Sequence, residues 1–120
     1  MLSRRLLRVK VAKALYAHLK SNSDIRVSEK NLVESIDKAY DLYFQMMSFI
    51  VEVARYAENR IELNKQKKLP TYEDLNPNRR FVDNPVIQLI ANSDSVNDVL
   101  ASRKLSWANH SDAIKDVYNR

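Results

Sequence analysis

Apolar residues near the start of the chain recur with the period of an α-helix. One stripe consists of Leu7, Val11, Ala14, Leu15 and His18. Ser3 precedes this pattern and can act as N-cap, because its hydroxyl can accept a hydrogen bond from a free backbone N–H. We therefore predict a helix from about Ser3 to Lys20, followed by a polar turn at 21–24. A second apolar patch flanks the stripe, so we expect this helix to be buried on more than one side.

A second apolar stripe runs for about forty residues without a proline or glycine. It consists of Leu32, Ile36, Ala39, Tyr43, Met46, Ile50, Val53, Ala57 and Ile61. Intervals of three and four predict one long helix from about Ser28 to Lys67, with Ser28 as its N-cap. Between Tyr40 and Ala54 apolar residues occupy all sides of this helix. We therefore expect that stretch to form the core.

Prolines end the long helical pattern. Pro70 and Pro77 exclude a continuous helix, and we expect an ordered loop over residues 69–81. Three short helices are predicted beyond it, at about 85–91, 96–102 and 112–120, with Asn84, Ser95 and Ser111 as N-caps. The turn at 104–110 carries Trp107, the only tryptophan, which we expect to anchor the C-terminal turns on the long helix.

Composition narrows the fold further. The chain has 120 residues, 45% of them hydrophobic, and contains neither glycine nor cysteine. Tight glycine-based hairpins, disulfides and thiolate metal sites are therefore excluded, and helices must end on residues such as Asn, Ser or Lys. We predict a single all-α domain, a helical bundle in which a basic N-terminal helix packs on one very long helix, followed by short helices.

Residues suited to catalysis are scarce. The two histidines are His18, on the apolar stripe, and His110, near a predicted cap; neither belongs to a metal or nucleophile motif. We expect His18 to be a core residue with one nitrogen satisfied. We predict no enzymatic activity, no cofactor and no metal. No run of about 18 apolar residues is present, so we expect no membrane partner, and we predict a cytoplasmic location.

Positive charge is the remaining signal. The chain has 20 Lys and Arg against 15 Asp and Glu, a net charge of +5. Five cations fall in the first helix and are the candidate RNA-binding residues: Arg4, Arg5, Arg8, Lys10 and Lys13. Arginine and lysine can donate to phosphates. The same charges can also keep an apolar helix soluble, and their spacing alone favours neither interpretation.

The pattern R-R-x-x-R at Arg4, Arg5 and Arg8, followed by A-L-Y-A at residues 14–17, resembles the N-terminus of the NusB family of transcription antitermination factors. The family has an acidic residue where this chain has Val9, and glutamine where it has Lys13. Three segments are also similar to a longer bacterial subgroup of NusB-like proteins: RRLLRVKVAKALYA, KQKKLPTYEDLNPNRRFVDNP and KLSWANH. The comparison, together with a last helix that nothing terminates, predicts that the chain is the N-terminal part of a longer protein.

The resemblance implies an all-helical protein that binds boxA-type RNA together with the ribosomal protein NusE and acts on the transcription elongation complex. It implies RNA contact at Arg4, Arg5 and Arg8, and less directly at Lys10. Two alternatives stay open. In the first, the chain is a protein-interaction or dimerisation module, for example a homodimer, that does not bind RNA. In the second, it is the RNA-binding domain of an RNA methyltransferase whose catalytic part lies outside the chain.

Overall fold

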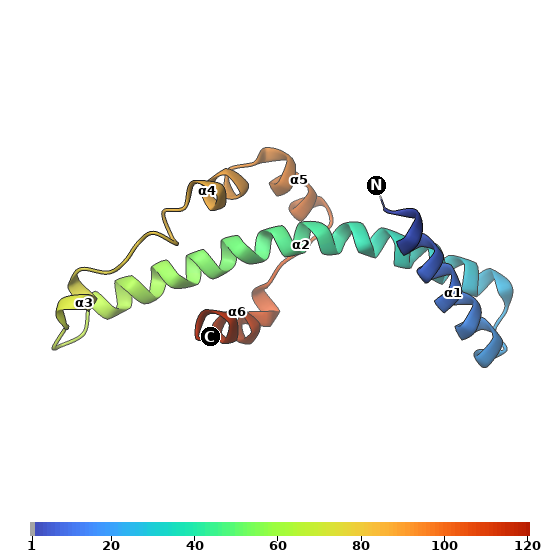
Figure 1. Ribbon diagram of the computed structural model, residues 1–120, viewed down its shortest axis with the longest axis horizontal. Coiled ribbons are helices and arrows are strands. Elements are labelled where there is room, and N and C mark those ends of the chain that lie inside the picture. Colours follow the sequence, from blue (N-terminus) through green and yellow to red (C-terminus); the bar gives the residue numbers. More distant parts are fainter. Residues whose placement is uncertain (1) are drawn as a thin grey trace. The chain divides into compact units, whose positions relative to one another are not determined.

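The computed structural model describes residues 2–120 and is all-helical across them (Figure 1). Its elements are α1 (Arg4–Ser21), α2 (Ile25–Lys65), α3 (Tyr72–Leu75), α4 (Pro85–Ala91), α5 (Asp94–Ser102), the 3-10 helix η1 (Ala108–His110) and α6 (Ser111–Tyr118). The predicted all-α fold, with a basic N-terminal helix on one very long helix and short helices after it, is confirmed. The chain divides into two compact units: unit 1 ends at Leu42, and unit 2 is Tyr43–Arg120. Helix α2 contributes to both.

Unit 1 is an α-helical hairpin of α1 and the first part of α2. As predicted, the Ser3 hydroxyl caps α1, accepting from the backbone N–H of Leu6 at 3.2 Å. The helix ends at Asn22, whose φ of 47° lies in the left-handed region that glycine usually occupies. Asparagine tolerates this conformation better than most residues, so it can end a helix in a chain without glycine.

Helix α2 begins three residues earlier than predicted, and Ser28 is not its N-cap. Asp24 occupies the start instead: its Oδ1 accepts from Arg26 N at 3.1 Å, and its carbonyl accepts from the Val27 and Ser28 N–H groups. The Ser28 hydroxyl is used in the hairpin, 3.0 Å from His18 Nδ1 and 3.1 Å from Ser23 Oγ. Asp24 and Ser28 are both residue types that favour the N-cap position. Asp24 occupies this position, and Ser28 lies within the helix with its hydroxyl bonded to His18.

The core overlaps the end of the predicted stretch 40–54 and continues beyond it along α2. Tyr40, Leu42, Tyr43 and Met46 are exposed, whereas the buried residues of α2 are Val51, Val53, Ala54, Ala57 and Ile61. Ala54 packs with Ile87 of α4, and Ala57 packs with Val82. The two alanines allow the later segments to approach α2 closely, which explains why the core gathers around them rather than around the larger side chains before them.

The short helices partly follow the prediction. Helix α4 covers the predicted residues, with Asn84 Oδ1 accepting from Val86 N at 2.9 Å and proline in the first turn. Helix α5 begins at Asp94, with Ser93 rather than Ser95 at the N-cap position. The predicted loop at 69–81 contains α3, which starts at a capping box between Thr71 and Asp74.

Trp107 fastens the C-terminal segment to α2, as predicted. Its indole Nε1–H lies 2.9 Å from the Gln45 carbonyl and 3.2 Å from Ser48 Oγ, and its ring centroid is 4.7 Å from that of Phe49. Ile114 of α6 is buried, and Tyr118 packs edge-on against Tyr56 of α2. Unit 2 therefore has a small but real core.

Unit 1 has no such core. None of its described side chains is buried, and Leu15 and Leu19 of α1 are 54% and 75% exposed. The expectation that α1 is buried on more than one side is therefore wrong for this structure. A two-helix hairpin can cover only the facing stripe of each helix, because burial of the other apolar residues requires another layer.

Candidate nucleic-acid interface

Positive charge is concentrated in unit 1. Up to Leu42 the chain has nine Lys and Arg against five Asp and Glu, whereas unit 2 has eleven against ten. Unit 1 therefore carries four of the five net positive charges. Helix α1 itself contains six cations and no acidic residue. This imbalance makes α1 the surface of the chain best suited to a polyanion.

Four of the five predicted RNA-binding residues are exposed and form no ion pair with another described residue. Arg4, Arg5, Arg8 and Lys13 all lie on the surface of α1. None of the ion pairs between described residues includes any of them. Because no carboxylate has to be displaced first, these side chains can donate directly to an incoming phosphate.

Arg79 of unit 2 shows the contrasting environment. Its guanidinium lies 3.1 Å from Asp83 and 3.3 Å from Glu58 of α2. Hydrogen bonds to these carboxylates, first to Asp83, raise the pKa of Arg79 above its ordinary value. Arg79 therefore links the segment before α4 to α2, and its donors are already used.

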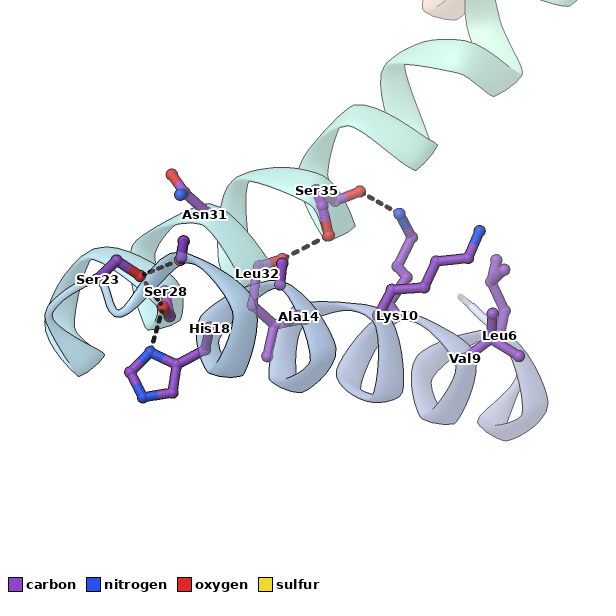
Figure 2. A pocket seen from close by; sticks show the side chains of 13 residues that line it. Leu6, Val9, Lys10, Ala14, His18, Ser23, Ser28, Asn31, Leu32 and Ser35 are labelled. Carbon is purple, nitrogen blue, oxygen red and sulfur yellow. Dashed lines mark hydrogen bonds between the residues drawn. The ribbon is translucent and has the colours of Figure 1, made fainter.

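Lys10 differs from the other four predicted residues. Its ammonium donates to the backbone carbonyl of Ser35 at 2.6 Å and crosses from α1 to α2 (Figure 2). That carbonyl belongs to α2, so Lys10 ties the two helices of the hairpin together. An ammonium has three N–H groups, and this contact occupies one of them.

The outward face of α1 adds an aromatic residue that the prediction left out. Tyr16 is 65% exposed, and Lys20 Nζ lies 5.9 Å from the centroid of its ring. Helical periodicity places Tyr16 three turns after Arg5, on the side away from the hairpin seam at Ala14 and His18. An exposed ring beside arginines can stack on an unpaired base. The eleven-residue spacing from Arg5 is the signal that could have identified it.

A groove of about 370 Å³ runs between α1 and α2 within unit 1. Figure 2 shows the two cross-links along it: Lys10 to the Ser35 carbonyl, and His18 to the Ser28 hydroxyl. The Nδ1 of His18 is satisfied by Ser28, so the expectation of one satisfied nitrogen is confirmed. The expectation that His18 is a core residue is wrong, because its side chain is only half-buried and no described residue of unit 1 is buried.

Other kinds of site find little support in the described part of the chain. No group of three or more His, Asp or Glu residues among residues 2–120 is arranged to hold a metal ion. Nor does any helix in that range combine the length and apolar character needed to cross a membrane.

Comparison with protein-family models, curated proteins and solved structures gave no match to the chain. The resemblance to NusB therefore stays a prediction.

Proposed function

We propose that the chain is a non-enzymatic RNA-binding factor that holds RNA phosphates on α1. The observation that carries this proposal is the state of Arg4, Arg5, Arg8 and Lys13: exposed, outside every ion pair of the described residues, and on a helix without an acidic side chain. Free guanidinium groups form forked hydrogen bonds with phosphate oxygens and can stack on bases.

The NusB-like pattern at the same arginines supports a narrower role in transcription antitermination or termination control. In that role the ligand is boxA-type RNA, and NusE and the transcription elongation complex are the protein partners. The residues that carry the resemblance are also the residues that the structure leaves without ion-pair partners, so motif and geometry favour the same surface.

Fluorescence anisotropy of a labelled single-stranded boxA-type RNA tests the proposal. The variant is the triple change Arg4→Ala, Arg5→Ala and Arg8→Ala; alanine has the highest helix propensity, so α1 is preserved. Each lost contact with a single-stranded phosphate lowers the slope of log affinity against log salt by about 0.7, so the triple change should lower it by about 2.

A charge-matched control separates α1 from the protein's general basicity. Arg60, Lys68 and Arg80 of unit 2 are exposed and, like the α1 arginines, outside the ion pairs of the described residues. Their change to alanine removes the same net charge and should leave the slope within about 0.5 of wild type. Equal losses in the two triple variants would show that binding follows total charge, and the proposal would be rejected.

A second candidate function is favoured by the exposed apolar surface of unit 1. Six large apolar side chains of α1 are exposed: Leu6, Val9, Val11, Leu15, Tyr16 and Leu19. A hairpin with this surface and no buried side chain is typical of a module that gains its second layer from a partner protein or a second copy.

Light scattering with and without the boxA-type RNA distinguishes the two functions. The RNA-binding function expects a monomer whose mass rises by one RNA molecule. The interaction-module function expects a stable dimer whose mass and stability do not change when RNA is added.

A further inference from the structure

We infer that the groove between α1 and α2 seats one unpaired nucleotide of the bound RNA. This inference rests on the RNA binding proposed above and adds a requirement for single-stranded RNA. The outward arginines account for attraction to phosphate, whereas the groove accounts for which form of RNA is accepted.

The groove exists because α1 has small residues where it faces α2. Ala14 lies on the seam opposite Leu32, and Ala17 lines the groove one turn further along. A β-carbon alone leaves space between the helix backbones, and the cross-links at Lys10 and His18 hold the helices on either side of it (Figure 2). A volume of about 370 Å³ falls in the range of about 300–1,000 Å³ that small-molecule sites occupy.

The charge of the lining suits a phosphodiester. Among the described residues that form it there are two lysines, a histidine, an asparagine and four serines, and no Asp or Glu. The carboxylate adjacent in sequence to Ser35, that of Glu34, is 3.9 Å from Lys30 and so is itself paired. A groove with cations and without carboxylates attracts a phosphate instead of repelling it.

Two lining side chains have donors that the protein does not use. Lys13 is exposed and has no ion pair within residues 2–120, and in the same range the Asn31 amide makes no hydrogen bond. We assign Lys13 to the phosphate and Asn31 to the edge of the base, since an amide offers both donor and acceptor. The apolar side chains of Ala14 and Leu32, which line the groove between its two ends, provide a surface for the base (Figure 2).

A base held in a duplex cannot enter this groove, because it is stacked and paired within the A-form helix. The groove therefore predicts tighter binding of single-stranded RNA than of duplex RNA. Arginines acting alone predict the reverse order, since a duplex presents a higher density of phosphate charge.

The test compares two probes: a labelled twelve-residue RNA without self-complementarity, and the same strand annealed to its complement. Wild-type protein should bind the single strand about tenfold more tightly, the scale of one stacked base. Ala17→Phe fills the groove and should remove that preference. The matched control is Ala101→Phe on the exposed surface of α5 in unit 2, which lines no part of the groove and should keep the preference.

A further variant guards against misfolding of Ala17→Phe. Asn31 is exposed and in no hydrogen bond within residues 2–120, so Asn31→Ala should leave the helical circular dichroism unchanged while weakening single-strand binding about threefold or more. Equal binding of the two probes by wild type, or equal behaviour of the Ala101→Phe and Ala17→Phe variants, would overturn the nucleotide groove and leave RNA binding by α1 intact. Absence of binding to both probes would instead reject the proposed function, and the inference with it.

Discussion

Two residues adopt a backbone conformation that usually belongs to glycine. They are Asn22 at the end of α1, and Lys104 after α5 with a φ of 54°. A left-handed conformation costs an L-residue with a β-carbon about 1–2 kcal/mol, and a chain without glycine has to accept this cost. Asparagine reduces it by local hydrogen bonding, whereas lysine does not.

Lys104→Gly should therefore stabilise unit 2. Glycine removes the energetic cost of the left-handed conformation, and this gain exceeds the loss that comes from the higher conformational entropy of glycine in the unfolded chain. We therefore expect the free energy of unfolding, measured with urea, to rise by about 0.5–1 kcal/mol. Lys115→Gly within α6 is the control and should cost about 1 kcal/mol. A loss of stability in Lys104→Gly would contradict the argument.

Asp74 should titrate below its ordinary pKa of 3.8. Its carboxylate accepts from the backbone N–H of Thr71 at 3.1 Å, which is the main reason that its pKa is lowered, and from the Lys67 ammonium at 3.1 and 3.2 Å. A carboxylate with a lowered pKa stabilises the folded state above its unfolded-state value, and this contribution is lost as pH falls through the folded pKa. The α3 capping box should therefore still be closed at pH 3.8 and should open only as pH falls through the lower pKa of Asp74 in the folded state.

Proton NMR of the Thr71 amide and the Asp74 side chain follows this titration. Lys67→Met should raise the pKa of Asp74 only in part, because the Thr71 N–H still donates to it. Titration of wild-type Asp74 at or above 3.8 would show that the capping box does not persist in solution.

Single residues could be predicted where the relevant partner is close in sequence. Ser3 and Asn84 cap their helices as expected, since an N-cap bonds a neighbour two or three residues away. Ser28 was misassigned because its partner, His18, lies ten residues earlier and on another helix. Lys10 was grouped with the free arginines because the Ser35 carbonyl that it contacts is visible only in the folded hairpin.

At the scale of elements, the α1–α2 hairpin should depend on the Lys10 cross-link. Lys10→Met keeps the aliphatic stem and removes the bond to the Ser35 carbonyl, at an expected cost of about 1 kcal/mol to the local stability of the hairpin. Hydrogen exchange of the α1 backbone amides should then accelerate about fivefold. Lys13→Met is the matched control, because Lys13 has no such bond among the described residues, and it should leave exchange unchanged. Equal exchange rates in the two variants would show that the Lys10 ammonium does not hold the two helices of the hairpin together.

The elements themselves were predictable to different degrees. Helices α1 and α4 were placed to within a residue, because a cap and an apolar stripe coincide at each. Helix α3 was missed because four residues between two prolines are too few to show a period. The stripe of α2 was read correctly, but periodicity indicates which face is apolar and not which segment covers it. The predicted core at 40–54 therefore includes Val51, Val53 and Ala54, but it begins too early and misses Ala57 and Ile61.

At the scale of the whole molecule, the two units should open with different ease. Unit 2 contains all the buried side chains of the described chain, and unit 1 contains none. Trypsin cuts after Lys and Arg. Unit 1 has nine of these residues and unit 2 has eleven, so the two units offer similar numbers of cleavage sites. We therefore expect the first cuts in α1, with Arg55 and Arg60 cleaved more than about tenfold later, because proteolysis follows local opening.

Mass spectrometry of the early fragments checks this order. Added boxA-type RNA should delay the cuts in α1 and leave those at Arg55 and Arg60 unchanged. Simultaneous cleavage of α1 and the segment around Arg55 would show that the chain opens as one cooperative unit. The division itself was not predictable from the sequence, because the apolar stripe of α2 continues across residues 42 and 43 without a change of period.

The single tryptophan gives the molecule a built-in optical reporter. Trp107 lies in unit 2 with its indole N–H bonded to the Gln45 carbonyl and its ring against Phe49, and unit 1 contains no tryptophan. Emission excited selectively at indole therefore follows the docking of the C-terminal segment on α2. Loss of the Gln45 contact exposes the indole to water and shifts this emission to the red. Undocking of the C-terminal segment from α2 can thus be followed by fluorescence without an added label.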